Sequence, residues 1–176
     1  MRCWIQLVLL SACLIGCERA ETDEERLKRF VPNALSTTKV SGNVTVDGAP
    51  VKDLTVTLHP SEATVRSRTP GDPNSQLLPR AQTDAEGKFR ITTYNGGDGA
   101  PKGEYNITIE WLTYIKRSSD WGGPDKLKNQ YNDPKTTPFH VTVEDQPLVL
   151  PAFELKVAGV EGKAAPTKPP ENKREK

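Results

Sequence analysis

The chain has 176 residues, which suits one domain of modest size with additional segments at its ends. It contains 24 Lys and Arg residues against 23 Asp and Glu residues, a formal net charge of +1. If Arg2 is removed with an export signal, the mature chain carries 23 charges of each sign (24 − 1 against 23). A neutral surface with mixed charges gives no electrostatic reason to expect a nucleic acid partner.

The first residues have the pattern of an exported lipoprotein. Arg2 precedes a short apolar run, which is too short to span a bilayer and is typical of a secretory signal. The run ends in Leu-Ile-Gly-Cys at residues 14–17, which resembles a bacterial lipobox whose cysteine accepts diacylglycerol. Cys17 is favoured over Cys13 because it stands where the apolar run ends and charged residues begin. We therefore expect a signal peptide at residues 1–16, and the alternative is an ordinary secretory signal with a coincidental cysteine.

All three cysteines lie in this first segment, at positions 3, 13 and 17. The sequence after Cys17 therefore has no disulfide, no thiolate metal ligand and no thiol nucleophile. If lipid occupies Cys17, the expected location is a membrane that this anchor holds, with the chain facing the periplasm or the cell surface.

Two polar segments flank the expected domain. Residues 17–37 begin with a charged stretch that favours a disordered tether, partly helical in places. Residues 158–176 are rich in Lys and Pro, which predicts a disordered, extended tail. The folded domain is expected at residues 38–157.

The segment between these ends alternates short apolar patterns of period two with turn residues. This pattern predicts strands at residues 40–46, 54–58, 81–84, 88–94, 104–112, 139–143 and 152–157. The strands at 81–84 and 88–94 are expected to form a hairpin around residues 84–87, and Asp47-Gly48 is a second hairpin turn signal. Two long loops are expected, at residues 61–79 and 113–138. About seven short strands without a strong helix predict an all-β sandwich.

The order of the turn motifs carries a family resemblance. The sequence Val-Ser-Gly-Asn-Val at residue 40 with Asp-Gly-Ala-Pro-Val at residue 47, Thr-Asp-Ala-Glu-Gly-Lys-Phe at residue 83 and Gly-Ala-Pro-Lys-Gly-Glu-Tyr at residue 99 resembles a carboxypeptidase regulatory-like, or transthyretin-like, domain. Tyr-Asn-Asp-Pro at residue 131 and Phe-Glu-Leu at residue 153 resemble small transthyretin-like lipoproteins abundant in planctomycetes. The resemblance covers about residues 38–157. It implies a seven-stranded Greek-key β-sandwich in the cell envelope, generally without catalysis.

The titratable residues give little indication of an enzyme. The two histidines, His59 and His140, are expected to be solvated strand residues. No nucleophile-elbow or zinc motif is present in the sequence. The least poor metal hypothesis is calcium at Asp84, Glu86 and Asp98, but surface acids are the better interpretation. We therefore expect no catalytic residue, no metal and no cofactor.

Aromatic residues in the second long loop suggest a binding surface. Trp121, Tyr114 and Tyr131 lie close to Asn and Asp residues, and sugar CH faces stack on aromatic rings. The alternative is that these rings fasten a long loop to the edge of the sandwich. The expected function is a lipid-anchored envelope module with a structural or protein-interaction role. A carbohydrate-binding module is the first alternative, and a hydrolase is the second. Its partners would be the membrane and an envelope protein or polysaccharide.

Metabolic labelling with a palmitate analogue tests the anchor. Label is expected on the wild-type chain and absent from Cys17→Ser, because the substitution removes the thiol that accepts the lipid. Each buried CH₂ of that lipid contributes about 0.8 kcal/mol to membrane binding. Cys13→Ser is the matched control and should remain labelled. Label that persists on Cys17→Ser and disappears from Cys13→Ser would place the lipid at the other cysteine.

Overall fold

A computed structural model of the chain describes residues 21–68, 72–117 and 120–157. Two compact units divide between Pro32 and Asn33, so the larger unit begins before the predicted domain start at residue 38. Cys17, Cys13 and the predicted tail at 158–176 lie outside the described residues. No helix in the described part of the chain is long and apolar enough to cross a membrane.

The first unit contains a short helix where a disordered tether was expected. Helix α1 (Asp23–Phe30) begins at a capping box, in which the Thr22 side chain accepts from the Glu25 backbone N–H and the Glu25 carboxylate accepts from the Thr22 backbone N–H. Lys28 and Arg29 lie in the last turn, where positive charge is favourable. Residues 23–30 thus form the helical part that the composition of this segment allowed, and two capping interactions close its first turn.

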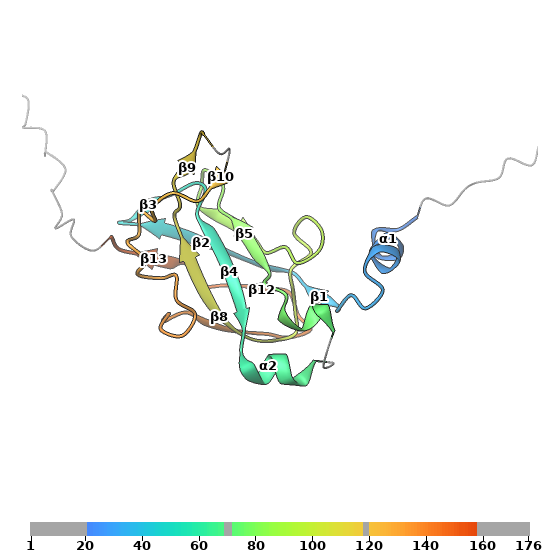
Figure 1. Cartoon of the computed structure of the whole chain (residues 1–176). Helices are drawn as coiled ribbons and strands as arrows, with labels where there is room; N and C mark the ends of the chain where they lie inside the picture. Colours follow the sequence, from blue (N-terminus) through green and yellow to red (C-terminus); the bar gives the residue numbers. More distant parts are fainter. Residues whose placement is uncertain (1–20, 69–71, 118–119, 158–176) are drawn as a thin grey trace, which may run out of the picture. The chain divides into compact units, whose positions relative to one another are not determined.

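The second unit is an all-β, sandwich-like fold with two main layers (Figure 1). In the first sheet the strands follow the order β11 (His140–Val143), β8 (Gly103–Glu110), β4 (Thr55–Pro60) and β5 (Arg80–Gln82), with antiparallel pairing throughout. The second sheet is built on β2 (Val40–Val46), which pairs antiparallel with β3 (Ala49–Pro50) and β6 (Lys88–Arg90), and parallel with β12 (Leu148–Val149) and β13 (Phe153–Leu155). Two short pairs complete the fold: β1 (Thr37–Thr38) with β7 (Ala100–Pro101), and β9 (Tyr114–Ile115) with β10 (Asp120–Trp121).

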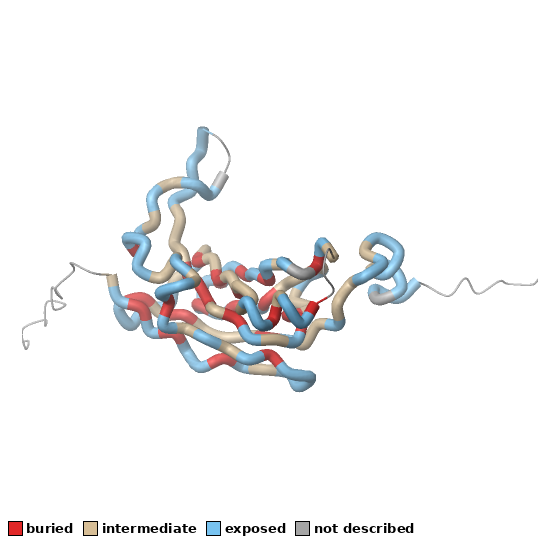
Figure 2. The backbone as a smooth tube through the Cα atoms, turned by 60° about the horizontal axis from the view of Figure 1, so that its bottom comes forward, coloured by how far each residue is buried: buried red, intermediate tan, exposed pale blue. Residues whose placement is uncertain are grey.

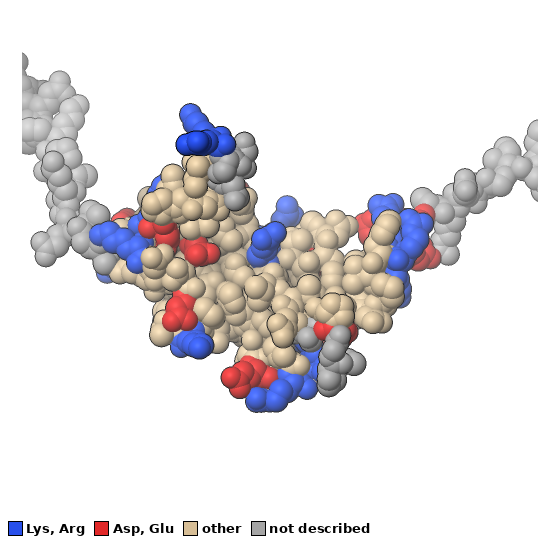
Figure 3. Space-filling model, viewed as in Figure 1, with Lys and Arg blue, Asp and Glu red and all other residues tan. Residues whose placement is uncertain are grey.

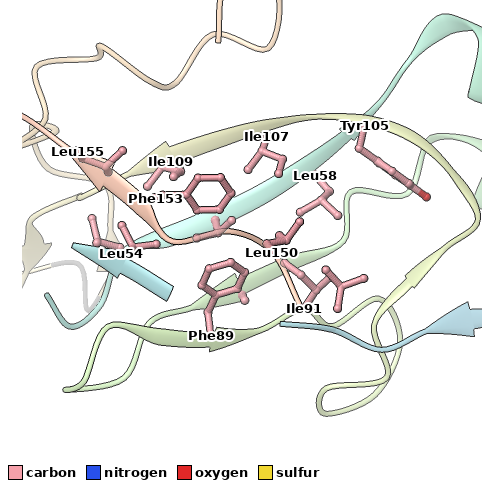
Figure 4. Packing of buried hydrophobic residues seen from close by; sticks show 14 of the residues in the cluster. Leu54, Leu58, Phe89, Ile91, Tyr105, Ile107, Ile109, Leu150, Phe153 and Leu155 are labelled. Carbon is pink, nitrogen blue, oxygen red and sulfur yellow. The ribbon is translucent and has the colours of Figure 1, made fainter. Parts of the chain in front are cut away.

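The core forms where the inner faces of the two layers meet, and buried residues follow those faces (Figure 2). Alternate residues of β4 and β8 point inward as their sequence pattern predicts, and Phe89, Ile91, Phe153 and Leu155 point toward them from the other layer (Figure 4). The rings of Phe89 and Phe153 stack with centroids 6.3 Å apart. A Cβ on Gly42 would lie 2.6 Å from the Phe89 ring, so glycine at this position lets the ring lie against β2.

The predicted turn at residues 84–87 forms, but the two strands that it joins belong to different sheets. The Asp84 carboxylate accepts hydrogen bonds from the backbone N–H groups of Glu86 and Lys88, and Gly87 has a φ of 73°. β5 then pairs with β4, whereas β6 pairs with β2. The hairpin prediction is therefore wrong beyond the turn, although a bridge between Arg80 and Thr92 still links the two segments.

The first long loop contains regular structure that the sequence pattern did not predict. Helix α2 (Glu62–Ser67) is capped by the Ser61 side chain, and a 3-10 turn (Pro73–Gln76) is capped by Asp72. After α2, the buried Arg68 donates a 2.6 Å hydrogen bond to the Tyr105 hydroxyl, which in turn donates to the Pro101 carbonyl. This chain of hydrogen bonds holds the loop against the end of β8.

Candidate functional site

The outer face of the four-stranded sheet carries rows of polar side chains. The register between β4 and its neighbours sets these rows, because residues that alternate with the core positions point to the opposite face. One row runs Glu110–Thr55–Gln82, the next runs Thr108–Thr57–Arg80, and a third pairs Asn106 with His59. Thr108 is buried and its hydroxyl is hydrogen-bonded to His59, whereas the side chains of Thr55, Thr57 and Gln82 are more accessible and can donate and accept hydrogen bonds.

All of these row residues except Asn106 line an open groove with a volume of about 1020 Å³, called here the polar groove. Its remaining walls come from loops on both sides of the sheet. The lining residues are Thr55, Thr57, His59, Leu78, Arg80, Ala81, Gln82, Arg90, Thr92, Thr93, Tyr94, Thr108, Glu110, Leu112, Trp121 and Asn132. Most of the surface over β4 and β8 is uncharged, and the charged residues of this face gather toward its margins (Figure 3).

The β9–β10 hairpin places the indole of Trp121 at the wall of the polar groove. The hairpin stands out from the body of the domain (Figure 2), and Trp121 pairs in register with Tyr114. Their ring centroids are 5.1 Å apart with an interplanar angle of 60°, so Tyr114 supports the indole without itself lining the groove. Trp121 remains 37% exposed and lines the polar groove.

Tyr131, which the sequence grouped with Trp121 and Tyr114, has a different environment. Its ring stacks on Phe139 with centroids 5.7 Å apart, and its hydroxyl lies 3.3 Å from the backbone nitrogen and oxygen of Lys156. Its carbonyl accepts a 2.9 Å hydrogen bond from the Ile109 backbone N–H. Tyr131 thus makes the fastening contacts considered as the alternative, and its place on a ligand surface stays a prediction.

The second long loop is held in place by two residues that the sequence analysis missed. The Asp125 carboxylate accepts hydrogen bonds from the backbone N–H groups of Trp111, Leu127 and Asn129. The side chain of Leu127 is fully buried in the core. A lone leucine two residues after an aspartate, in an otherwise polar stretch, was the signal available in the sequence. Both contacts fasten the segment that follows the Trp121 hairpin.

The two histidines lie on the outer face of the sheet. Within the polar groove, the His59 Nε2 lies 2.9 Å from the Thr108 hydroxyl, and burial lowers the pKa of the imidazole. His59 is therefore half-buried and hydrogen-bonded, whereas full solvation was expected. The exposed His140 has its Nδ1 2.8 Å from the Asn106 side-chain oxygen.

Glu110 is the carboxylate that lines the polar groove. Burial raises its pKa from the ordinary value of 4.5, the negative charge of Asp125 raises it further, and a hydrogen bond to the Asn132 side chain opposes both effects. Asp125 does not line the groove, and its oxygens already accept three backbone N–H groups. The lining of the groove thus contains one carboxyl group, and the pKa of that group is raised.

Two of the three acids considered for calcium, Asp84 and Asp98, accept hydrogen bonds from backbone N–H groups, and Glu86 is an exposed residue. Asp84 caps the turn before β6, and Asp98 accepts from the backbone N–H groups of Thr93, Tyr94 and Asn95. The described residues contain no group of three or more His, Cys, Asp or Glu side chains that could hold a metal ion. The carboxylates of Asp84 and Asp98 therefore stabilise the turns in which they lie.

Comparison with known proteins adds no relative to this description. No family model matches the chain, and no curated protein matches it. The groove must therefore be interpreted from its own residues.

The raised pKa of Glu110 predicts a pH-dependent stability. The folded protein holds this proton more tightly than the unfolded chain, so the ionised carboxylate costs stability above the raised pKa. That cost disappears as the pH falls below the ordinary carboxyl pKa of 4.5. Relative to wild type, Glu110→Gln is therefore expected to be more stable at pH 7 than at pH 4, with a larger free energy of unfolding measured by urea denaturation.

The matched control is Gln82→Ala, which changes the same row of the groove without removing a titratable group. Its difference from wild type should stay constant between the two pH values. A Glu110→Gln difference that is equal at both pH values, or larger at pH 4, would contradict the assigned environment of this carboxyl group.

Proposed function

We propose that this protein is a lipid-anchored module of the cell envelope that binds a polysaccharide in the polar groove and performs no catalysis. The anchor is Cys17, and the chain is exported and faces the periplasm or the cell surface. The proposal makes the expected interaction role specific, and it selects a polysaccharide over an envelope protein as the partner.

The polar groove itself carries this proposal. Its floor consists of threonine, amide and imidazole groups that match the alternating donors and acceptors of sugar hydroxyls. The rings of Trp121 and Tyr94 line its sides and offer flat faces for sugar CH groups. Protein interfaces usually have an apolar, aromatic centre with a polar rim. Here the centre is polar and the aromatic rings lie at the margins, an arrangement that favours a polysaccharide.

The titratable groups of the groove support binding without turnover. Glycoside hydrolysis generally uses two carboxyl groups that flank the scissile bond. Among the residues that line the groove, Glu110 is unaccompanied by a second carboxylate, and the nearby Asp125 is committed to backbone N–H groups. His59 is directed at Thr108, and no third group in the described residues orients that pair toward a ligand.

We also propose the seven-stranded Greek-key topology and the transthyretin-like family that the sequence resembles. Seven strands have three or more residues in the described part of the chain: β2, β4, β5, β6, β8, β11 and β13. The parallel pairing of the last of these strands with the first, and the crossing of the chain from β5 to β6 between the sheets, support a Greek-key connection.

Loss of the Trp121 indole tests the polysaccharide proposal. Trp121→Ala should weaken the binding of a polysaccharide to the full chain, purified in detergent, by about tenfold, since a ring contact of roughly 1.4 kcal/mol corresponds to that change in Kd. The measurement is affinity electrophoresis or calorimetry against a panel of neutral and acidic polysaccharides, with reducing-end release followed in the same samples.

Phe30→Ala is the matched control, because Phe30 is an exposed aromatic residue outside the groove. Its affinity should equal that of the wild type, and no sample should release reducing ends. Wild-type protein that binds no polysaccharide, or equal affinity of Trp121→Ala and wild type, would remove the proposed function. Reducing-end release by the wild type would restore the hydrolase alternative.

A further inference from the structure

A second groove adjoins the polar groove at the margin where β5 and β6 meet. It has a volume of about 880 Å³ and lies along the outer face of the β2–β6 sheet. Gln82, Arg90 and Thr92 line both grooves. The two grooves therefore share a junction, and a long ligand seated in the polar groove can continue past β6.

Three cationic side chains gather at this junction. Arg80 lies opposite Thr92, so Arg90, two residues earlier on the same face, is its diagonal neighbour. Lys88 lies two residues before Arg90, on the same face of β6, and lines the second groove. All three are exposed. Arg90 lines both grooves, Arg80 lines the polar groove, and Lys88 lines the second groove.

Several basic residues in the described part of the chain have a carboxylate partner. Arg26, Arg66 and Lys102 each form an ion pair with an Asp or Glu side chain. Neither Arg80 nor Arg90 forms one among the described residues. Two exposed guanidinium groups, close together and without counterions, attract an anion and can bind it with paired N–H donors.

The acids that line the two grooves do not neutralise this junction. Asp84 already accepts two backbone N–H groups within its turn. Glu110 lies at the far end of its row, separated from Gln82 by Thr55. Burial also raises the pKa of the Glu110 carboxyl, which reduces its negative charge in mildly acidic conditions. The positive charges of the junction are thus not neutralised by the lining acids and can attract an anionic ligand.

We propose that the ligand of this surface is an anionic polysaccharide, whose carboxylate or sulfate groups bind Arg80 and Arg90 while an adjacent sugar ring stacks on Trp121. This inference rests on the proposed function and assigns the charge class of its ligand. Lys88 extends the cationic side to a second repeat unit of the chain. The hydroxyl-rich floor selects a sugar backbone over an acidic polypeptide.

Matched polymers can separate charge from sugar recognition. The probes are polygalacturonate and its fully methyl-esterified form, dextran sulfate and dextran, and polyglutamate as an anion without sugars. Binding to the full chain in detergent is measured for wild type, Arg80→Gln, Arg90→Gln, the double variant and Arg66→Gln. Arg66 is an exposed arginine on α2 that lines neither groove. Arg66→Gln therefore changes the net charge by the same amount as either single variant.

The wild type is expected to bind at least one anionic polysaccharide about tenfold more tightly than its neutral counterpart, and this preference should fall with added salt. The double variant should lose the preference for the anionic polymer over its neutral counterpart, and Arg66→Gln should keep the preference of the wild type. A preference for polygalacturonate identifies carboxylate as the anion, and one for dextran sulfate identifies sulfate.

Equal affinity for charged and neutral polymers would overturn this inference and leave the proposed function standing. An equal loss in Arg66→Gln would reduce the effect to net charge, and equally tight binding of polyglutamate would show that no sugar is recognised. Both results would overturn the inference. Failure to bind any polysaccharide would instead remove the proposed function itself.

Discussion

The register between β4 and β8 is the constraint on which the rest of this structure depends. Six residue pairs, from Thr55 opposite Glu110 to Pro60 opposite Tyr105, join the two central strands of the sheet. The period of two sends their apolar residues into the core and their polar residues to the outer face. A slip of one residue would exchange the two sets and bury threonines where leucines and isoleucines now pack. Core stability and the composition of the polar groove are therefore consequences of the same pairing.

The groove also depends on how the second long loop is fastened. Leu127 enters the core, and Asp125 satisfies three backbone N–H groups that would otherwise lack partners. Lys126 adds a contact over the Trp111 ring, with its amine 4.2 Å from the ring centroid. These contacts anchor the segment after the β9–β10 hairpin, so that an exposed tryptophan can be held beside the sheet. Asp125 and Leu127 thus hold this loop in place, whereas Trp121 of the same loop lines the polar groove.

The sequence predicted the parts of the fold that follow from local periodicity. The inward residues of β2, β4 and β8, the Asp84 turn and the burial of Phe89 all agree with the alternating pattern. Pairing between distant segments was less accessible, since a turn signal such as Asp84 to Gly87 does not reveal that its two strands enter different sheets. Helix α2 was also missed, because its six residues carry no apolar period and depend on the Ser61 cap.

The sequence also predicted some features of the candidate site and missed others. The sequence grouped Trp121, Tyr114 and Tyr131 by nearness along the chain. In the structure the rings of Trp121 and Tyr114 are in contact, whereas Tyr131 stacks on Phe139. The threonine rows and the cationic junction arise from pairing across strands, which a single sequence does not display. Arg80 and Arg90 in particular become neighbours through the link between Arg80 and Thr92, on segments that precede and follow the Asp84 turn.

The central claim is that a ligand binds across the outer face of the β4–β8 pair, and chemical-shift mapping tests it most directly. Backbone amide and indole N–H signals of the full chain in detergent micelles would be followed while an acidic oligosaccharide is added. If the polar groove is the binding surface, the largest shifts will occur at Thr57, Arg80, Thr108 and the Trp121 indole. Shifts concentrated on β11, at Thr142 for example, with those four signals unchanged, would contradict the claim.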